Sequence, residues 1–340
     1  MPKWVKEIGP ESDIAISSRI RMARNIESMP FPNDLNEAQS KNILEMVHHT
    51  ITNANSSFKK EFELIEMNRQ DKIERLNYIE KHLISPALAQ NTTGGAALIN
   101  KEETISIMVN EEDHIRIQCL LPGLQLTECL DLGNKIDDLL EESIRYSFDE
   151  NLGYLTSCPT NVGTGVRASV MLHLPALSLT GYINGVFNVA SKIGLAVRGI
   201  YGEGSQYTGN IYQISNQITL GPPEEELVST LHDVTMQIIQ NERAVREHLL
   251  ASKNIELSDR VFRAYGILKS ARLLTSTEAM QLISDLRLGV NLNLIQDVSI
   301  EKINELMVTI QPGYLQKYFN SDLSGIERDI KRAQLVRETL

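Results

Sequence analysis

Short segments of alternating apolar and polar residues run through the first two thirds of the sequence. In residues 104–109 the apolar side chains stand at positions 105, 107 and 109, and in residues 115–119 they stand at 115, 117 and 119. Further strand-like segments lie at 14–24, 96–99, 166–172, 195–201 and 211–220. A period of two residues is typical of β-strands with one buried face. We therefore expect a run of antiparallel strands, with residues 110–114 forming the turn of a hairpin.

Longer segments carry apolar residues every three or four positions, as amphipathic helices do. They predict helices over residues 36–53, 71–83, 134–148, 175–193 and 222–250. From about residue 253 the chain shows short helices and no strand pattern. There Thr275 and Glu278 form a capping box, Gly289 ends that helix, and Ser299 and Ser324 begin two more.

These elements predict an α+β fold class. An antiparallel β-sheet flanked by helices would occupy residues 1–250, and a small all-α C-terminal domain would occupy residues 251–340. We assign the sheet region to catalysis and the helical domain to dimerisation and ligand binding, for reasons that follow from the motifs below.

Composition narrows the possible partners. Of 340 residues, 42% are hydrophobic and 23% are charged, which is ordinary for a globular protein. The chain has 33 basic and 44 acidic residues, and the net charge of −11 opposes binding to nucleic acids and anionic membranes. No apolar run reaches the roughly 18 residues of a membrane span, and the N-terminus does not resemble a signal peptide. Three cysteines without metal-ligand spacing favour reduced thiols and a cytoplasmic location.

Arginine recurs at polar positions of the predicted strands. The residues are Arg19, Arg21, Arg116, Arg167 and Arg198. A guanidinium group on a sheet face is unfavourable unless it meets an anion. Together they favour one polyanionic ligand, such as ATP with Mg²⁺, although Arg19 and Arg21 alone fit a solvated surface strand equally well. The sequence has no GxxxxGK[ST] motif and no HRD or DFG motif, which excludes P-loop and Ser/Thr/Tyr kinases.

Two carboxylates end arginine-bearing strands, Glu112 in the hairpin turn and Glu203 after the strand of Arg198. Paired carboxylates can clamp a guanidinium, and one can accept a proton as nitrogen attacks phosphorus. The pattern fits phosphoryl transfer from ATP to a guanidino nitrogen. Taken alone, the hairpin turn would be a solvated tip with incidental charges. Cys158 is either a buried small residue or a reactive thiol, and its residue type favours burial.

Four motifs in one order resemble the catalytic domain of guanidino (phosphagen) kinases over residues 14–245. They are SSRIR at 17–21, NEEDHIR at 110–116, CPTNVGTGVRAS at 158–169, and the segment from Arg198 to Glu203. The resemblance implies that Glu112 is the base, that Glu203 is a second guanidinium clamp and that Cys158 lies beside the guanidinium. It implies nucleotide contacts by Ser17, Ser18, Arg19, Ile20, Arg21, His82, Arg116, Arg167, Ala168, Ser169, Val170, Met171, Arg198, Gly199, Ile200, Tyr201, Gly202 and Glu203. No residue is expected to bind a metal directly.

Two departures point to one branch of this family. Guanidino kinases of small metabolites have a helical domain before the first motif, where this sequence has a dozen residues, and they lack the C-terminal helices. The sequence RDIKRA at 328–333 resembles bacterial protein-arginine kinases, in which RDxxRA is implicated in phosphoarginine binding and allosteric control. The residues implied are Arg328, Asp329, Arg332 and Ala333. On charge pattern alone, Arg328, Asp329 and Arg332 would be a salt-bridged, solvated helix face.

The resemblance predicts an enzyme that phosphorylates arginine side chains of proteins and marks them for Clp-type proteolysis. The implied partners are misfolded proteins, a heat-shock repressor, the Clp chaperone-protease, a zinc-binding activator protein and a second copy of the chain. Neither nucleic acid nor membrane is expected as a direct partner. A free-arginine kinase and a non-catalytic phosphoarginine-binding adaptor are the alternatives.

Overall fold

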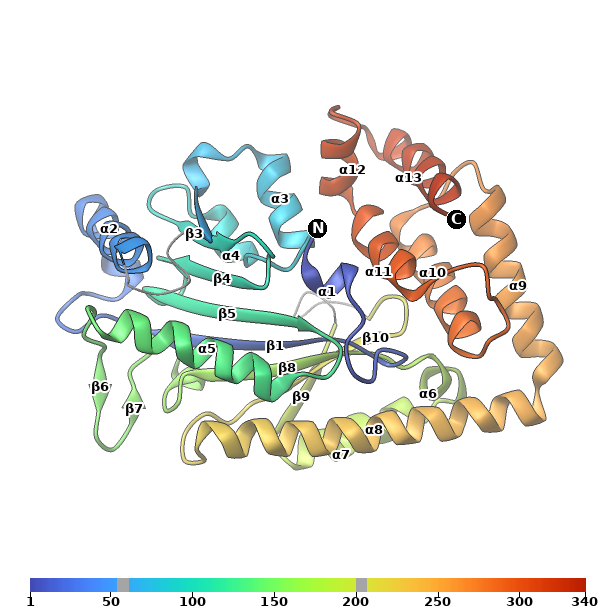
Figure 1. The fold of residues 1–340 in the computed structure, drawn as a ribbon, viewed down its shortest axis with the longest axis horizontal. Coiled ribbons are helices and arrows are strands. Elements are labelled where there is room, and N and C mark those ends of the chain that lie inside the picture. Colours follow the sequence, from blue (N-terminus) through green and yellow to red (C-terminus); the bar gives the residue numbers. More distant parts are fainter. Residues whose placement is uncertain (54–60, 200–206) are drawn as a thin grey trace.

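One antiparallel sheet organises the fold. The computed structural model describes residues 1–53, 61–199 and 207–340, and within these ranges eight strands pair in the order β2-β3-β4-β5-β1-β8-β10-β9 (Figure 1). The strands are β1 (Ala15–Arg24), β2 (Phe62–Glu66), β3 (Ala96–Asn100), β4 (Ile105–Val109), β5 (Ile115–Pro122), β8 (Val166–His173), β9 (Leu195–Arg198) and β10 (Ile211–Asn216). The predicted sheet is confirmed. The first strand of the chain, β1, lies between β5 and β8.

Helices lie against both faces of this sheet. The helices that precede the C-terminal part are α1 (Lys3–Lys6), α2 (Glu37–Asn53), α3 (Lys72–Glu80), α4 (Pro86–Gln90), α5 (Leu126–Glu141), α6 (Pro175–Thr180), α7 (Ile183–Lys192) and α8 (Glu224–Ser252). The largest hydrophobic cluster packs α2, α5 and α8 onto the sheet; it includes Ile20, Ile43, Ile117, Ile136, Val170 and Ile239. The predicted alternation in β4 and β5 is confirmed, because Ile105, Ile107, Ile115 and Ile117 all belong to this cluster.

The opposite face is apolar at its two ends and polar between them. At one end, Met108 and Ile99 pack with residues of α3, α4 and the segments beside them. At the other end, Leu120 and Met171 pack with α1 and the C-terminal helices. The strand positions between these clusters hold arginine and amide side chains instead. The fold therefore leaves a polar strip across the middle of the sheet.

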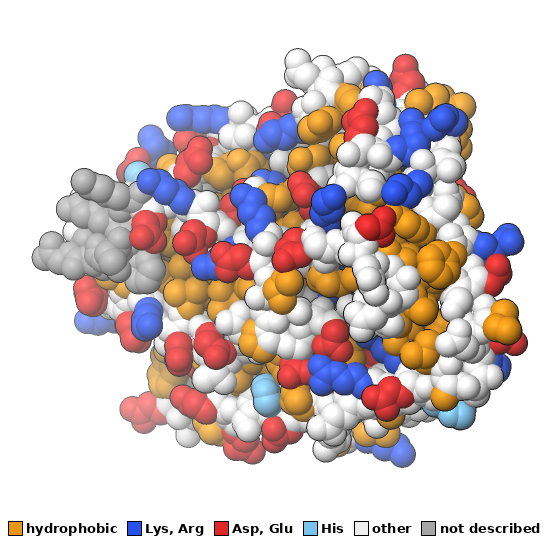
Figure 2. All heavy atoms as spheres, turned by 45° about the vertical axis from the view of Figure 1, so that its right-hand side comes forward, with side chains coloured by type: hydrophobic (Ala, Val, Ile, Leu, Met, Phe, Trp, Pro, Cys, Tyr) orange, Lys and Arg blue, Asp and Glu red, His pale blue; other side chains and the backbone are white. Residues whose placement is uncertain are grey.

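The C-terminal part is all helical, as predicted. It consists of α9 (Asn254–Ser270), α10 (Ser276–Asn291), α11 (Ile300–Thr309), α12 (Pro312–Tyr318) and α13 (Gly325–Thr339) (Figure 1). The expected boundary near residue 250 falls in the last turn of α8, which ends at Ser252. The helices share a hydrophobic cluster with Trp4, Leu120 and Met171. The division into two domains remains a prediction. Figure 2 shows acidic and basic side chains intermixed over this side of the molecule.

Capping residues in the sequence correctly marked the starts of α2, α10, α11 and α13. The side chains of Thr275 and Ser299 accept hydrogen bonds from backbone N–H groups at the starts of α10 and α11. Ser324 forms a capping box with Glu327 at the start of α13. Asn36 Oδ1 accepts a hydrogen bond from the N–H of Gln39 at the start of α2 (2.9 Å). A polar cap is a local feature, so sequence alone is enough to find it.

Glycines caused the errors in helix prediction. We expected a helix at 134–148, but α5 spans Leu126–Glu141, because Gly133 lets the helix approach β1: a Cβ there would lie 2.8 Å from the Cε of Met22. The helix expected at 175–193 is broken at Gly181, which has φ of 78°. Gly289 does not end α10. A Cβ at that position would lie 2.2 Å from Val261, so this glycine permits close packing against α9.

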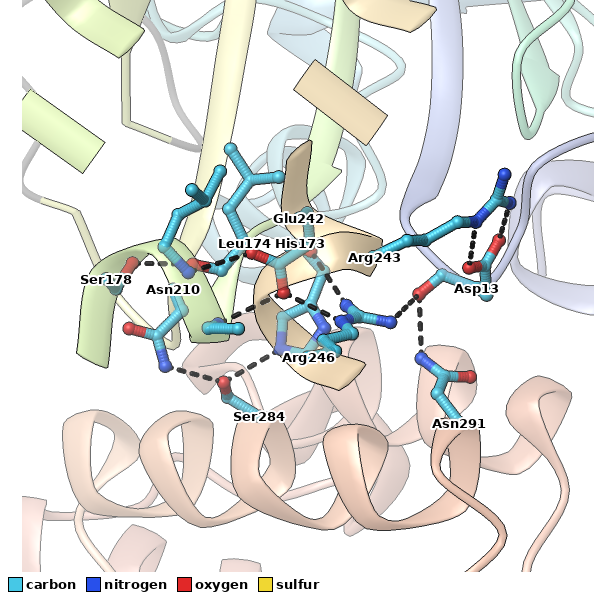
Figure 3. Close-up of polar contacts among 12 residues, drawn as sticks. Asp13, His173, Leu174, Ser178, Asn210, Glu242, Arg243, Arg246, Ser284 and Asn291 are labelled. Carbon is cyan, nitrogen blue, oxygen red and sulfur yellow. Dashed lines mark hydrogen bonds and ion pairs between the residues drawn. The ribbon is translucent and has the colours of Figure 1, made fainter. Parts of the chain in front are cut away.

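A buried polar network joins the sheet region to the C-terminal helices (Figure 3). Glu242 on α8 accepts hydrogen bonds from Arg246 Nε (2.7 Å) and from the N–H of Leu177 (2.9 Å). His173 Nε2 contacts Ser284 Oγ of α10 (2.8 Å), and Asn210 Nδ2 donates to the same oxygen (2.8 Å). Because a buried polar group is expensive when it loses its partner, this network fixes how α10 sits against β8 and β10.

We expect acidic pH to destabilise the fold through His173, which belongs to this network. Burial lowers the pKa of His173 well below its ordinary value, and Arg287 and Arg246 lower it further. The unfolded chain then binds a proton that the folded chain does not, so stability falls as the pH drops below about 6.5. Between pH 7.5 and 5.5 this contributes a loss of about 1.4 kcal/mol. Buried carboxyl groups act in the opposite direction; burial raises the pKa of Glu80 to about 7.

The measurement is therefore a difference between two proteins. Thermal unfolding of the wild type and of His173→Gln at pH 7.5 and 5.5 isolates the histidine, because all carboxyl groups are common to both. The variant should lose less stability on acidification. Equal losses in the two proteins would contradict the assignment.

Candidate active site

A cleft opens over the polar strip of the sheet. It has a volume of about 210 Å³. Six of the predicted site residues line it with five others; the lining is Arg21, Ala23, Glu112, Arg116, Cys158, Thr160, Asn161, Gly165, Arg167, Arg198 and Gln213. Four of the five predicted arginines thus meet the predicted base and thiol in one place, although these residues come from five separate segments. The strand order produces this meeting, because β1 lies between β5 and β8 and β10 lies between β8 and β9.

A smaller cavity adjoins this cleft and shares Arg21 and Arg116 with it. Its lining includes Arg19, His82 and Gln118 together with apolar side chains such as Ile79 and Met108. His82 follows α3 in a left-handed conformation (φ 61°), and its carbonyl accepts a hydrogen bond from Gln118 Nε2 (2.8 Å). The predicted site of nucleotide-base packing therefore lies next to the arginine cleft.

The arginines of the cleft are held close to one another. Arg21 stands directly opposite Arg167 in the β1–β8 register, and like charges in such pairs are destabilising. The pKa of Arg19 is lowered to about 10 by burial, with repulsion from Arg116 and Arg167 adding to the effect. Burial, followed by repulsion from Arg19, lowers the pKa of Arg21 well below its ordinary value. A bound polyanion would relieve this repulsion.

Arg21 and Arg19 differ in what they contact. The Nε of Arg21 is buried and has no hydrogen-bond partner among the residues that the structure describes. Arg19 Nη2 donates to Gln213 Oε1 of β10 (2.8 Å), and its Nε lies 3.4 Å from Ser169 Oγ. Arg19 is thus positioned by neighbouring side chains, whereas Arg21 retains unused donor capacity at the border of both cavities.

The hairpin turn provides the acidic groups. Arg116 Nη2 donates to Glu112 Oε2 (2.7 Å), and its Nη1 forms an ion pair with Glu111 (2.5 Å). Glu112 remains 43% exposed at its side chain, whereas Glu111 is 3% exposed and accepts a hydrogen bond from Ser85 Oγ (2.7 Å). Glu112 thus already binds one guanidinium and faces the cleft. Glu111 acts as the fixed counterion of Arg116.

The other wall of the cleft is the segment of Cys158 and the Gly163-Thr164-Gly165 turn. Cys158 Sγ lies 3.0 Å from Thr160 Oγ1. Gly165 has φ of 68°, and a Cβ there would lie 2.6 Å from the carbonyl oxygen of Ala23, so the turn requires glycine. Arg24 fixes this turn from behind, donating to the carbonyl of Thr164 (2.9 Å) and to Asp137 of α5 (2.6 Å).

Several predicted nucleotide contacts do not turn their side chains toward the cleft. Ile20, Ala168 and Val170 belong to the hydrophobic core on the other face of the sheet. Ser18 Oγ donates to the carbonyl of Gly123 (2.9 Å), and Ser17 is buried. Met171 packs in the cluster with the C-terminal helices. Only backbone atoms of these residues could serve a ligand.

Part of the predicted site lies beyond the residues that the structure describes. Arg198 lines the cleft at the end of β9, and Gly199 follows it as a buried residue. Ile200, Tyr201, Gly202 and Glu203 lie outside the described residues. The second carboxylate clamp therefore remains a prediction.

The C-terminal motif is divided between surface and interior. Arg328 lines a cavity of about 610 Å³ between α3, α12 and α13, and it donates to the carbonyl of Leu323 (3.1 Å). Arg332 is 2% exposed and donates to the carbonyls of Ile310 (2.7 Å) and Leu274 (2.8 Å). The expectation that Arg328 and Arg332 share a surface is wrong, because Arg332 turns inward and donates to one carbonyl at the end of α11 and to another just before α10. Its partner is Asp329, and Ala333 is fully buried.

Sequence reasoning missed residues that complete the site. Glu111 and Asn161 stand inside recognised motifs, but their residue types did not distinguish them from their neighbours. Asn161 Oδ1 accepts a hydrogen bond from Arg167 Nη2 (3.3 Å). Gln213 and Arg24 had no sequence signal beyond a polar residue on a strand. They are found only once the strand order is known.

The described part of the chain has neither a membrane-spanning helix nor a cluster of metal ligands. Among the described helices, none combines the length and apolar character that a bilayer crossing requires. In residues 1–53, 61–199 and 207–340, no group of three or more His, Cys, Asp or Glu side chains could hold a metal ion.

Comparison with known families assigns both parts of the chain. The model of the ATP:guanido phosphotransferase C-terminal catalytic domain matches residues 42–245. The model of the C-terminal domain of the protein-arginine kinase McsB matches residues 254–340. Among solved structures, the duplicated taurocyamine kinase from Schistosoma mansoni has a TM-score of 0.62 at 23% identity, covering 73% of this chain and 36% of that one. Lombricine kinase has a TM-score of 0.61 at 22% identity, covering 73% and 72%. These structures share the fold.

Relatives over nearly the full length are much closer in sequence. A protein-arginine kinase of Geobacillus sp. (strain WCH70) is 53% identical over 337 residues, covering 99% of this chain and 93% of the relative. That of Bacillus cereus (strain AH820) is 52% identical, covering 99% and 95%. That of Caldanaerobacter subterraneus is 51% identical over 330 residues, covering 97% and 98%. The sheet with its arginine cleft and the helical region behind it are therefore those of a protein-arginine kinase, and the chain belongs to that family.

Proposed function

We propose that this chain transfers the γ-phosphoryl group of ATP to the guanidinium groups of arginine side chains in proteins. The observation that carries the proposal is the convergence of Arg21, Arg116, Arg167 and Arg198 with Glu112 in one cleft. The arginines repel one another, and Glu112 already binds a guanidinium. One ligand of this cleft is thus a polyanion, and the other is a guanidinium.

The chemistry follows from these two preferences. Glu112 would hold the acceptor guanidinium by hydrogen bonds in place of Arg116 and orient one nitrogen toward phosphorus. As the N–P bond forms and the bond from phosphorus to the β-phosphate oxygen breaks, Glu112 would take the proton that the nitrogen loses. The arginines would neutralise the charge spread over the phosphoryl oxygens and the leaving ADP. Cys158 would contact the guanidinium from the other wall, and Glu203 would provide the second clamp.

Mg²⁺ would reach this site on the nucleotide. The carboxylates nearest the arginines, Glu111 and Glu112, are engaged with Arg116, and the described residues hold no cluster of metal ligands. This fits an ion that keeps phosphate and water ligands instead of a protein cage. Bound there, Mg²⁺ would neutralise phosphate charge.

The identity of the phosphoryl acceptor is tested by offering the enzyme two alternative substrates. The protein is incubated with ATP and Mg²⁺ and either an unfolded protein or free arginine, and acid-labile phosphate is measured on each. Label on the protein supports the proposal. Label on free arginine alone would show a metabolite kinase, and no label on either would favour a phosphoarginine-binding adaptor.

Regulation and partners follow from the C-terminal helices. The cavity at Arg328 is our proposed phosphoarginine site, since a guanidinium fork suits a phosphoryl group; Asp329, Arg332 and Ala333 would shape it from below. Ile255 and Phe262, two turns apart on α9, are 83% and 52% exposed, which favours a homodimer or larger assembly through these helices. Three free thiols favour the cytoplasm.

Protein partners are proposed from family membership. A heat-shock repressor and misfolded proteins would be substrates, the Clp chaperone-protease would receive the marked proteins, and a zinc-binding activator protein would control the kinase. Stress response and protein degradation are the processes that these partners share.

Arg328→Ala should abolish the response to added phosphoarginine and leave ATP binding intact. We expect apparent affinity for free phosphoarginine to fall by about tenfold or more, because a charged hydrogen bond is lost. Arg332→Ala on the same helix should instead lower the melting temperature, because it leaves buried carbonyls unpaired. Transfer rates with and without phosphoarginine measure the response; an unchanged response in Arg328→Ala would remove the regulatory role.

A further inference from the structure

The two walls of the cleft are carried by segments that are not neighbours in the sheet. Glu112 precedes β5, and Cys158 lies in the segment that leads to β8. Strand β1 lies between β5 and β8. Two strand spacings amount to roughly 10 Å. Something must hold the turn and the segment at a fixed separation if a guanidinium is to fit between Glu112 and Cys158.

A buried pair of side chains spans this gap. Asn25, just beyond the end of β1, donates from Nδ2 to Asp113 Oδ1 (2.7 Å) and to the carbonyl of Leu155 (3.0 Å). The Oδ1 of Asn25 accepts a hydrogen bond from the N–H of His114 (2.9 Å). Asp113 Oδ1 in turn accepts a hydrogen bond from the N–H of Ser157 (2.7 Å).

The position of these contacts in the sequence is informative. Asp113 directly follows Glu112, and Ser157 directly precedes Cys158. Each anchored residue is therefore adjacent to a side chain that faces the cleft. Asn25 and Asp113 are 1% and 0% exposed and do not line the cleft. They cannot touch a substrate, but they can fix the groups that do.

The imidazole of His114 secures the same end of β1. Its Nδ1 accepts a hydrogen bond from the N–H of Ile26 (3.0 Å), and its Nε2 contacts the carbonyl of Pro30 (2.7 Å). A carbonyl can only accept, so Nε2 donates and the ring is the neutral tautomer protonated there. The chain after β1 is thus held against the hairpin turn at two points, and Asn25 directly precedes the first of them.

We infer that Asn25 and Asp113 are positioning residues that set the separation of Glu112 and Cys158 and thereby the geometry of the acceptor site. The inference rests on the proposed function, because it assigns the two walls to the acceptor guanidinium. Displacement of a reacting group by about 1 Å can reduce a rate about 100-fold. The arginines on β1 and β8 that would bind the nucleotide are positioned by strand pairing. They do not depend on the hydrogen bonds of Asn25 and Asp113.

The test compares two buried asparagines. Asn25→Ala removes three hydrogen bonds beside the active site. Asn100→Ala is the matched control and removes three hydrogen bonds at the far end of β4, to Thr104 and Ile105. Melting temperature, kcat for protein-arginine phosphorylation and KM for ATP are measured for both.

Asn25→Ala should lower kcat about 100-fold and leave KM for ATP within about twofold. Asn100→Ala should keep kcat within about threefold at a similar loss of melting temperature. Loss of activity in proportion to loss of stability in both variants would overturn the inference, as would an unchanged kcat in Asn25→Ala.

A second pair of variants covers the case in which Asn25→Ala does not fold. Asp113→Asn keeps an oxygen for both of its donors and should retain kcat within about fivefold, whereas Asp113→Ala should lose about 100-fold. Equal losses would show that the charge matters, which would overturn the positional role.

Alkylation of Cys158 gives a readout that does not need catalysis. Cys119 and Cys129 are buried, so an alkylating reagent reports Cys158 in the folded protein. The rate in Asn25→Ala should differ at least about threefold from the wild-type rate, and the rate in Asn100→Ala should not. If the wild type phosphorylates no arginine, the proposed function fails. The alkylation rates would still decide whether Asn25 and Asp113 fix the position of the Cys158 segment.

Discussion

Glu112→Gln is expected to reduce phosphoryl transfer to arginine by about a thousandfold, because the amide cannot accept the proton released by the attacking nitrogen. The fold should be unaffected, since the glutamine oxygen can still accept the hydrogen bond that Arg116 donates in the unliganded protein. ATP affinity should change by no more than about twofold, because the side chain faces the acceptor. Single-turnover transfer and equilibrium ATP binding separate the two quantities.

A second hairpin supplies the control for this variant. Glu102 stands in the β3–β4 turn, where it pairs with Lys3 at 3.2 Å and is 63% exposed. Like Glu112, it is an exposed carboxylate in a hairpin turn with a basic partner. Glu102→Gln should leave transfer unchanged. Near-normal transfer by Glu112→Gln would reject its role as the base and turn attention to Glu203.

Arg21→Met should have opposite effects on ATP binding and on stability. Loss of a guanidinium–phosphate contact worth about 1.5–3 kcal/mol would weaken ATP binding about 10- to 150-fold. The unliganded protein should become more stable, because the mutation removes a buried charge that Arg19, Arg116 and Arg167 repel. Calorimetric ATP binding and thermal unfolding without nucleotide measure the two effects.

Arg287 provides the contrasting case. Its pKa is also lowered to about 10 by burial, but its guanidinium donates to Asn304 and to the carbonyl of Ser12. Arg287→Met should therefore destabilise the protein and leave ATP affinity unchanged. If Arg21→Met also destabilises the unliganded protein, the arginines of the cleft are structural cations and the electrostatic argument for a polyanion fails.

The sheet was predictable from sequence because its signals are local. Alternation identified which residues of β1, β4 and β5 face the core, and so placed the arginines on the opposite side. Alternation could not show that Arg21 and Arg167 lie opposite each other, since this depends on the pairing of β1 with β8, strands more than a hundred residues apart. The convergence of the arginines was expected from their recurrence on separate strands and from the family resemblance, and the structure supplies its geometric cause.

The remaining differences between the sequence-based expectations and the structure arise from packing between distant segments. Glu111 and Glu112 are identical neighbours in sequence, and only the position of Ser85 beside Glu111 shows which of them is the buried counterion. Arg328 and Arg332 are one turn apart, yet the carbonyls that draw Arg332 inward belong to α11 and to the segment before α10. Gly133 reads as a helix breaker until β1 is known to pass beneath it.

Trp4 gives the molecule an intrinsic optical probe. It is the only tryptophan of the chain. It is 1% exposed, and its ring lies 5.6 Å from that of His82, which lines the cavity beside the arginine cleft. Its hydrophobic neighbours include the C-terminal helices. Trp4 thus lies where the cavity beside the arginine cleft and the helical region meet, so its fluorescence should report ligand binding at either in the unlabelled protein.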